Sequence, residues 1–183
     1  MLHKASIAFQ KLIQGSLVSL LIGLPATLLC LLPPLAAVPV GAETLGDRMI
    51  RWWSGGLMRI FGMRLRRFGT PLPGAVLFVA NHVSWIDIEA LHSQRMMGFV
   101  AKHEIRGWPV VGWLVTRAGT LYIERASRRD AMRVNQMLAN AMLEGDAMAV
   151  FPEGTTSDGL GLLPFKASLF ESARVAGSLI RPV

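Results

Sequence analysis

Cysteine and acidic residues are scarce in this sequence, and each scarcity narrows the kind of protein it encodes. The only cysteine, Cys30, lies within an apolar run. Neither a disulfide framework nor a cysteine-ligated metal site can be built from one cysteine, and a catalytic domain facing the cytosol is allowed. Twelve acidic residues stand against 19 lysines and arginines, which gives a formal net charge of +7. Such an excess suits an anionic membrane surface, a phosphorylated substrate or nucleic acid.

Charge is absent altogether from a long stretch near the N-terminus. Between Lys11 and Glu43 there are 31 uncharged residues, enough for a membrane-embedded segment. Pro25 and three later prolines interrupt or end its most apolar part, 17–32, so one straight helix is not expected. A cleaved signal peptide is the competing interpretation, but its apolar core usually has about 7–15 residues. A retained anchor is therefore favoured, and this apolar excess makes nucleic acid the weaker choice of partner.

A basic and aromatic segment follows the uncharged stretch. Residues 48–68 contain six arginines, two tryptophans and no acidic residue. This mixture is typical of a helix lying in the lipid headgroup layer, and a helix packed on the main domain is the alternative. The more basic flank of the anchor belongs to the main domain. We therefore expect the catalytic domain to face the cytoplasm at the inner membrane or another membrane, whether the anchor spans the bilayer or re-enters it.

From Pro73 onward, short apolar runs alternate with longer segments of helical spacing. Strands are predicted at 75–80, 98–101, 120–124, 147–151 and 179–183, and helices at 85–97, 109–117, 128–144 and 165–176. This order predicts an α/β fold, a largely parallel sheet with helices on both faces, preceded by N-terminal membrane-associated helices. Residues 1–70 would form the anchor and interfacial segment, and 71–183 the α/β domain. A chain that stops on a predicted strand at Val183 is expected to be truncated.

The stretch 80–87, Ala-Asn-His-Val-Ser-Trp-Ile-Asp, joins the first predicted strand of this domain to its first helix. His82 lies at the carboxyl end of the strand, and Asp87 falls in the first helical turn. A carboxylate that holds one imidazole nitrogen fixes the tautomer and leaves the other nitrogen free as a base. The same residues allow a structural interpretation, because Ser84-x-x-Asp87 matches a capping box.

Polar residues also follow three further predicted strands. Lys102 follows the second strand, Arg125 the third, and Glu153 the fourth, within Phe-Pro-Glu-Gly-Thr-Thr-Ser at 151–157. Ligands of open parallel sheets bind outside the carboxyl ends of the strands. Two cations and a Gly-Thr turn at one edge of the sheet would form an anion-binding site, with a catalytic base beside it. Singly, Arg125 could equally form a surface salt bridge with Asp130, and Glu153 could sit in a turn fixed by proline.

Three blocks of this sequence resemble those of the glycerolipid acyltransferase family, which includes bacterial 1-acylglycerol-3-phosphate acyltransferase. They are NHVSWID at 81–87, GTLYIER at 119–125 and FPEGTTS at 151–157, and IRPV at 180–183 resembles the start of a fourth. The resemblance covers about 74–183. It implies that an acyl chain moves from acyl-CoA or acyl carrier protein onto the free hydroxyl of a lysolipid, first of all 1-acylglycerol-3-phosphate, giving phosphatidate.

The resemblance also implies roles for the residues of these blocks. His82 would be the general base, Asp87 its orienting partner, and Arg125 would bind the acceptor phosphate. The other implied acceptor-site residues are Glu153, Gly154, Thr155 and, as an accessory, Lys102. Two departures from the family pattern leave acceptor preference open. Thr156 stands where many members have Arg, and 165–168 reads Phe-Lys-Ala-Ser where many have Phe-Lys-x-Gly.

The chemistry of the residues agrees with these roles. A lipid hydroxyl is a poor nucleophile near neutral pH, and a positioned base contributes about 10²–10⁴ in rate. A thioester is already activated, so we expect no metal and no cofactor beyond the acyl donor. There is no Gly-x-Ser-x-Gly motif and Cys30 lies in the apolar stretch, which favours direct attack without a covalent intermediate.

Three other functions compete with acylation of lysophosphatidate. The same chemistry could act on glycerol-3-phosphate, another lysophospholipid or a lyso-ornithine lipid. A metal-dependent membrane phosphohydrolase would use His82, Asp87 and Glu153 as ligands, but their spacing matches no familiar metal motif. A membrane adaptor without catalysis is disfavoured by the intact His82 and Asp87.

Overall fold

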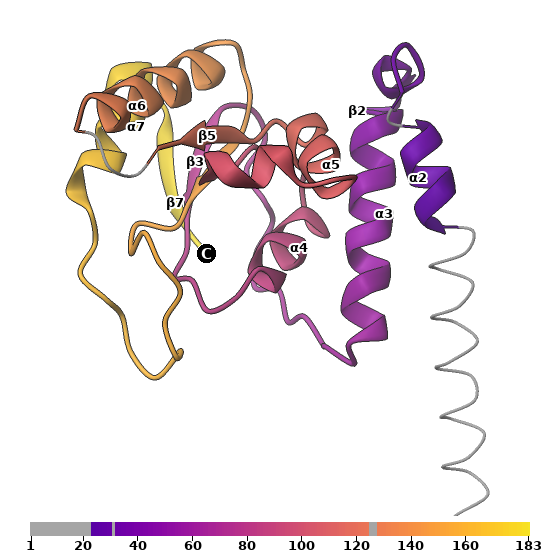
Figure 1. Cartoon of the computed structure of the whole chain (residues 1–183), viewed down its shortest axis with the longest axis horizontal. Helices are drawn as coiled ribbons and strands as arrows, with labels where there is room; N and C mark the ends of the chain where they lie inside the picture. Colours follow the sequence, from indigo (N-terminus) through magenta and orange to yellow (C-terminus); the bar gives the residue numbers. More distant parts are fainter. Residues whose placement is uncertain (1–22, 31, 125–127) are drawn as a thin grey trace, which may run out of the picture. The chain divides into compact units, whose positions relative to one another are not determined.

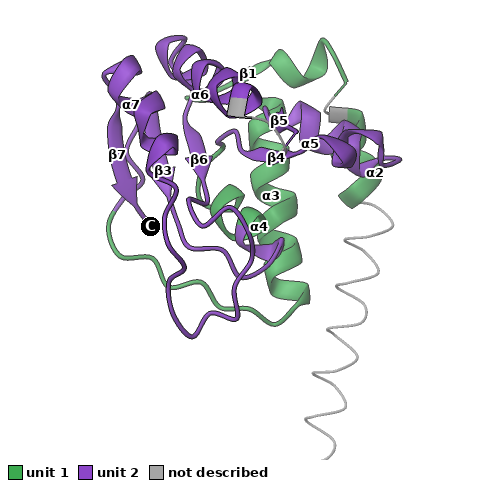
Figure 2. Ribbon diagram, turned by 60° about the vertical axis from the view of Figure 1, so that its left-hand side comes forward, with its two compact units in different colours: residues 1–69, 88–96 green, residues 70–87, 97–183 purple. Residues whose placement is uncertain are grey.

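The structure is a computed structural model that describes residues 23–30, 32–124 and 128–183. The chain divides into two compact units, which Figure 2 shows in different colours. The first unit comprises Met1–Gly69 and Ile88–Met96, and the second comprises Thr70–Asp87 and Met97–Val183. The segment Ile88–Met96 thus belongs to the first unit, although it follows the first strand of the second unit in sequence.

The described part of the first unit is mainly helical. Its elements are α2 (Leu24–Cys30), the 3-10 turn η2 (Leu35–Ala37), the antiparallel pair β1 (Pro39–Val40) and β2 (Glu43–Thr44), and α3 (Leu45–Ile60). A capping box starts α3, because the Thr44 side chain accepts the Asp47 N–H and the Asp47 carboxylate accepts the Thr44 N–H. Gly62, with φ +68°, follows the helix and closes it. α2 packs beside α3 (Figure 1).

The basic segment 48–68 divides into a packed helical part and an exposed part. On α3, Ile50, Ser54 and Met58 are buried at intervals of four residues, which places them on one face of the helix. The Ser54 hydroxyl donates to the Glu89 carboxylate at 2.6 Å within the same unit. Residues 61–70 form neither helix nor strand, and all of them are exposed.

Among the described residues, no helix combines the length and the apolar character that crossing a membrane requires. α2 has seven residues. The uncharged stretch at 12–42, where the sequence predicts the anchor, lies partly outside the described residues.

The described part of the second unit contains five strands that pair in parallel, which confirms the predicted α/β fold with a parallel sheet. They are β3 (Val76–Val79), β4 (Val100–Lys102), β5 (Leu121–Ile123), β6 (Met148–Val150) and β7 (Leu179–Pro182). Their order is β6-β3-β7 in one sheet and β4-β5 in the other. A parallel bridge between Gly98 and Met148 links the two sheets.

Helices alternate with these strands along the chain. They are α4 (Ile86–His92), which continues into the first unit, η3 (His103–Gly107), α5 (Val111–Arg117), α6 (Arg128–Leu143), η4 (Ala167–Phe170) and α7 (Glu171–Ala176). α6 and α7 lie together over one face of the sheet (Figure 1). The core between them and the sheet is formed by Leu77, Val79, Val134, Leu138, Met142, Met148, Val150 and Ala173.

β3 is the middle strand of its sheet and carries the first sequence block at its carboxyl end. Leu77 pairs with Met148 on one side and with Ile180 on the other. All four residues of β3 are buried. The chain therefore leaves the centre of the sheet directly into the loop that contains His82.

Candidate active site

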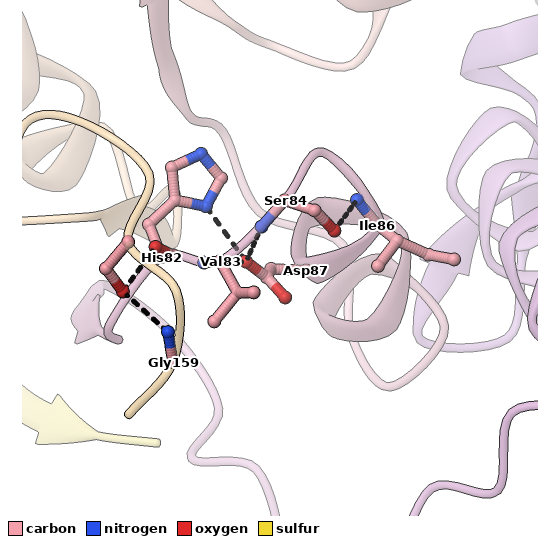
Figure 3. Close-up of polar contacts among 7 residues, drawn as sticks. His82, Val83, Ser84, Ile86, Asp87 and Gly159 are labelled. Atoms are coloured by element: carbon pink, nitrogen blue, oxygen red, sulfur yellow. Dashed lines mark hydrogen bonds and ion pairs between the residues drawn. The ribbon is translucent and has the colours of Figure 1, made fainter. Parts of the chain in front are cut away.

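The loop between β3 and α4 brings the side chains of His82 and Asp87 together (Figure 3). Nδ1 of His82 lies 2.9 Å from Oδ2 of Asp87. The same oxygen accepts the backbone N–H groups of Val83, at 2.7 Å, and Ser84, at 2.9 Å. An ionised carboxylate can only accept, so Nδ1 carries the ring hydrogen and donates it to Asp87. In the neutral imidazole, Nε2 then carries no hydrogen and can take a proton from a ligand.

Asp87 also satisfies the start of α4. Its carboxylate accepts the Ser84 N–H, and the Ser84 hydroxyl accepts the Ile86 N–H at 3.3 Å. The structural and the chemical interpretations of Asp87 are therefore compatible, because the same oxygen caps the helix start and contacts the imidazole. Loss of a helix-capping side chain typically costs about 0.5–2 kcal/mol, so replacement of Asp87 will affect stability as well as the orientation of His82.

The segment 151–157, which contains the third block, packs against His82. The Phe151 ring stacks on the imidazole with 4.0 Å between centroids and 13° between planes. Phe99 lies on Phe151 in turn, at 5.7 Å. The Ser157 N–H donates to the His82 carbonyl at 2.7 Å, and its hydroxyl donates to the same oxygen at 3.3 Å. The imidazole is thus held by a carboxylate at its edge and by an aromatic ring on its face.

His82 is enclosed but reachable. Its side chain is 17% exposed and that of Asp87 is 28% exposed. In Figure 3 the second ring nitrogen of His82 lies on the edge directed away from Asp87. A base in this position is partly shielded from water and can still meet the hydroxyl of a ligand.

Glu153 follows β6 and is buried without a partner. It is 5% exposed, and neither carboxylate oxygen has a hydrogen-bond partner among the described residues. Burial of a polar group without hydrogen bonds costs free energy. Because the segment that holds Glu153 also contacts His82, this carboxylate is an available acceptor for a polar group of a ligand.

Gly154 and Lys166 meet in the turn after Glu153. Gly154 has φ +69°, a conformation that favours glycine. A Cβ at Gly154 would lie 2.5 Å from Nζ of Lys166, so the ammonium group rests against this turn. The Lys166 N–H also donates to the Pro152 carbonyl at 2.8 Å. Thr155, the next residue of the turn, is exposed.

Of the two cations predicted at strand ends, Lys102 is among the described residues and Arg125 is not. Lys102 is the last residue of β4 and is exposed. Arg125 lies outside the described residues, two positions after β5 ends at Ile123. Asp130, the salt-bridge partner considered for Arg125, accepts from Arg133 Nε at 2.7 Å and from the Glu124 N–H. The Arg133 guanidinium, and after it the Glu124 N–H, hold the pKa of Asp130 below its ordinary value.

Sequence reasoning assigned no role to Phe151, Ser157 or Lys166. Phe151 and Ser157 stand at the two ends of a block whose middle was assigned, so their sequence signal was present. Lys166 lies in the segment after that block. Its approach to Gly154 depends on the return of the chain at 158–165, which no local pattern predicts.

Comparison with known proteins agrees with the sequence blocks. The family described as Acyltransferase matches residues 66–183. A 1-acyl-sn-glycerol-3-phosphate acyltransferase from Neisseria gonorrhoeae is 45% identical over 122 residues, which are 67% of this chain and 48% of that protein. A lyso-ornithine lipid O-acyltransferase from Pseudomonas aeruginosa is 41% identical over 139 residues, which are 76% of this chain and 54% of that protein.

A solved structure shows the same fold. The crystal structure of the 1-acyl-sn-glycerophosphate (LPA) acyltransferase PlsC from Thermotoga maritima matches with a TM-score of 0.63 and 26% identity, covering 74% of this chain and 56% of that chain. The chain spans about half the length of the curated relatives it matches. The family match extends from the end of the basic segment through every block described above. The chain belongs to the acyltransferase family.

Proposed function

We propose that this chain catalyses transfer of an acyl group from acyl-CoA or acyl carrier protein to the free hydroxyl of a lysolipid. The observation that carries the proposal is the Nδ1 hydrogen bond of His82 to Asp87, which leaves Nε2 as a base. The family match supports acyl transfer as the reaction class. Relatives named for 1-acylglycerol-3-phosphate and for lyso-ornithine lipid support a lysolipid as the acceptor.

The reaction proceeds by direct attack on the thioester. Nε2 of His82 takes the proton of the acceptor hydroxyl while its oxygen bonds to the thioester carbonyl carbon. The tetrahedral intermediate then expels the thiolate, which takes the proton back from the imidazolium. Asp87 stabilises the imidazolium between these steps, because its carboxylate accepts the Nδ1 hydrogen. General-base catalysis of this kind contributes about 10²–10⁴ in rate.

The acceptor head group binds beside this base, at the turn after β6. Glu153 accepts a polar group of the acceptor, and Gly154 and Thr155 shape the turn. Arg125 binds the phosphate, and Lys102 contributes positive charge as an accessory. Lys166 brings a further cation to the turn, in a chain that has Thr156 where many family members have Arg. The favoured acceptor is 1-acylglycerol-3-phosphate, with glycerol-3-phosphate, another lysophospholipid and lyso-ornithine lipid as alternatives.

The proposal is tested by product analysis. The purified chain is incubated with acyl-CoA or acylated carrier protein and each acceptor, and products are identified by mass. A product heavier than the acceptor by one acyl group supports the proposal, and transfer should persist in the presence of a chelator. Release of inorganic phosphate that stops on chelation would instead support the metal-dependent phosphohydrolase.

Arg125→Ala is expected to raise the KM for a phosphorylated acceptor about tenfold and to leave the KM for acyl-CoA almost unchanged. A hydrogen bond to a charged group contributes about 1.5–3 kcal/mol, and this variant loses one. Arg125→Lys should rescue only part of the effect, because an ammonium cannot form the paired contacts of a guanidinium. Steady-state kinetics with each substrate varied in turn measure both constants. A change confined to acyl-CoA would show that Arg125 serves the donor.

Gly154→Ala is expected to raise the acceptor KM, because the new methyl group displaces the Lys166 ammonium from the turn. The matched control is Gly177→Ala. Gly177 also has positive φ, at 63°, but no atom lies within 4 Å of its Cβ position. Both variants should lose about 1–3 kcal/mol of stability, because both place a Cβ on left-handed backbone. If their acceptor KM values are equal, Lys166 has no part in acceptor binding.

The anchor and the basic segment 48–68 are proposed to attach the enzyme to the inner membrane or another membrane, with the catalytic unit on the cytoplasmic side. A chain that starts at Glu43 should then float with anionic vesicles at low salt and be released at high salt. Arg64, Arg66 and Arg67 lie in the exposed part of the segment, and each contributes on the order of 1 kcal/mol near such a surface.

Vesicle flotation at two salt concentrations measures this attachment. The full chain should remain bound at high salt and require detergent for release. Replacement of Arg64, Arg66 and Arg67 by Gln is the matched variant of the shortened chain, and it should float less at low salt. Equal flotation of the two shortened chains would assign 48–68 a packing role only.

A further inference from the structure

The turn between η3 and α5 exposes three apolar side chains on the catalytic unit. Trp108 is 57% exposed, Val110 is 53% exposed and Val111 is 43% exposed. Single exposed apolar residues are ordinary on protein surfaces, whereas a contiguous group marks an interaction surface. The group formed by Trp108, Val110 and Val111 is called the apolar turn below.

The backbone at the tip of the apolar turn has a strained conformation. Val110 has φ 61° and ψ −56°, and the Val111 N–H donates to the Pro109 carbonyl at 2.6 Å. This is a three-residue γ-turn of the rare kind with positive φ. Val110 is the only residue other than glycine with positive φ in the part of the chain that the structure describes, and it is β-branched. Such strain persists where the surrounding structure imposes it, and it clusters at functional sites.

Close packing of Gly112 holds the turn in this shape. A Cβ at Gly112 would collide with the carbonyl of Arg106 and lie 2.7 Å from the carbonyl oxygen of Ile105. The Gly112 carbonyl accepts the hydroxyl of Thr116 at 2.7 Å and that of Tyr122 at 3.3 Å. The valine at the tip is therefore displayed on a fixed backbone.

The charges around the apolar turn are mostly positive. The charged residues of the segment 102–117 are Lys102, Glu104, Arg106 and Arg117, and all four are exposed, which leaves a net charge of +2. The segment thus presents an apolar tip with cations on both sides of it in the chain, which complements an anionic bilayer with a hydrocarbon interior.

We propose that the apolar turn inserts into the headgroup layer of an anionic bilayer and brings the catalytic unit to its lipid acceptor. The inference rests on the proposed function, because an acceptor with an acyl chain resides in a membrane. Tryptophan favours this layer, where its ring contacts hydrocarbon and its N–H stays near water. An acidic protein such as an acyl carrier protein would bind to the cations alone, because the apolar turn itself carries no charge. The exposed apolar side chains therefore favour a bilayer as the partner.

Site-directed spin labelling of the full chain tests the insertion. In a Cys30→Ser background, Val110→Cys carries a nitroxide, and Met132→Cys carries it in the control. Met132 lies on α6 of the same unit and is 63% exposed. With phosphatidylcholine–phosphatidylglycerol vesicles, the label at 110 should collide several-fold less with a water-soluble nickel chelate and more with oxygen. The label at 132 should not change.

Four results of this experiment would overturn the proposal. In the first, the chain floats with the vesicles while the label at 110 stays accessible to the nickel chelate, or both labels change alike. In the second, the label at 110 is already shielded without vesicles, which would indicate that a second copy of the chain covers the apolar turn. In the third, an acyl carrier protein shields it in the absence of lipid. Failure of the chain to bind vesicles at all would also overturn the proposal.

Val110→Gly tests the membrane contact by activity without destabilising the fold. It removes the apolar side chain and the strain together, so the unfolding temperature should stay the same or rise. Transfer to 1-acylglycerol-3-phosphate embedded in vesicles should fall several-fold, while transfer to a short-chain, monomeric acceptor should not change. Equal rates on vesicles would overturn the proposal. Absence of transfer by the unchanged chain would refute the proposed function, while the labelling result would still decide whether the turn inserts.

Discussion

His82→Ala is expected to lower the rate of acyl transfer by about 10²–10⁴ while the chain remains folded. The reason is that Nε2 is the proposed base, and an alanine has no group that takes the hydroxyl proton. The His82 carbonyl, which accepts Ser157, is a main-chain group and is retained in the variant. Loss of the imidazole therefore removes the chemistry and leaves the loop connected to the segment 151–157.

Rate and folding have to be measured on the same preparations. Transfer is followed by product mass, and the fold by circular dichroism and the unfolding temperature. His103→Ala is the matched control, because it removes an exposed imidazole of the same unit outside the site. A folded His82→Ala chain that keeps more than about a tenth of the rate would rule out general-base catalysis by His82.

Asp87→Asn should also lose most of its activity, with a smaller effect on stability. The amide oxygen can still accept the N–H groups of Val83 and Ser84, so the start of α4 is preserved. A neutral amide cannot stabilise the imidazolium, and its NH₂ group can force the ring into the other tautomer. Retained activity in this variant would show that Asp87 acts only on the helix start.

Gly98→Ala is expected to produce the largest loss of stability, about 3 kcal/mol. The new Cβ would lie 2.5 Å from the carbonyl oxygen of Gly119 and 2.7 Å from Cε of Met148. The first of these is a backbone atom that cannot rotate away, and Gly98 is where the two sheets of the second unit connect. To accommodate the methyl group, the segment before β5 would have to move away from Gly98.

Denaturant unfolding of Gly98→Ala and of Gly161→Ala measures this cost. Gly161 is exposed, and no atom lies within 4 Å of its Cβ position. Its replacement should change the free energy of unfolding by less than about 0.5 kcal/mol. Similar values for the two variants would mean that the sheets accommodate a side chain at 98.

The strands were predictable because their sequence signals are local. Each run, such as 75–80 or 147–151, is apolar and is bounded by turn or charged residues, and each strand falls within a residue or two of it. The order of the strands was not predictable, because β7 joins β3 across more than a hundred residues of chain. The helix predicted at 85–97 ends at His92, where the polar residues Ser93 and Gln94 form a turn. Nothing in its periodicity indicates that Ile88–Met96 belongs to the other unit.

In the candidate site, contacts within one loop were likewise predictable, and contacts between segments distant in sequence were not. His82 and Asp87 are five residues apart, so a turn between a strand and a helix suffices to predict their contact. Phe151 and Ser157 reach His82 only through the parallel pairing of β3 with β6, which places the two strand ends side by side. A sheet edge predicts that such residues gather, but the ring stacking and the carbonyl hydrogen bond require coordinates.

The central place of β3 has a consequence for how the site fails under stress. A strand with all residues buried and neighbours on both sides exchanges its amide hydrogens only when the whole unit opens. His82 follows this strand closely, whereas the return at 158–165 is an exposed connection. Partial unfolding would therefore first disturb the turn that Lys166 contacts, where the acceptor is proposed to bind. His82 would stay in place until the whole unit unfolds.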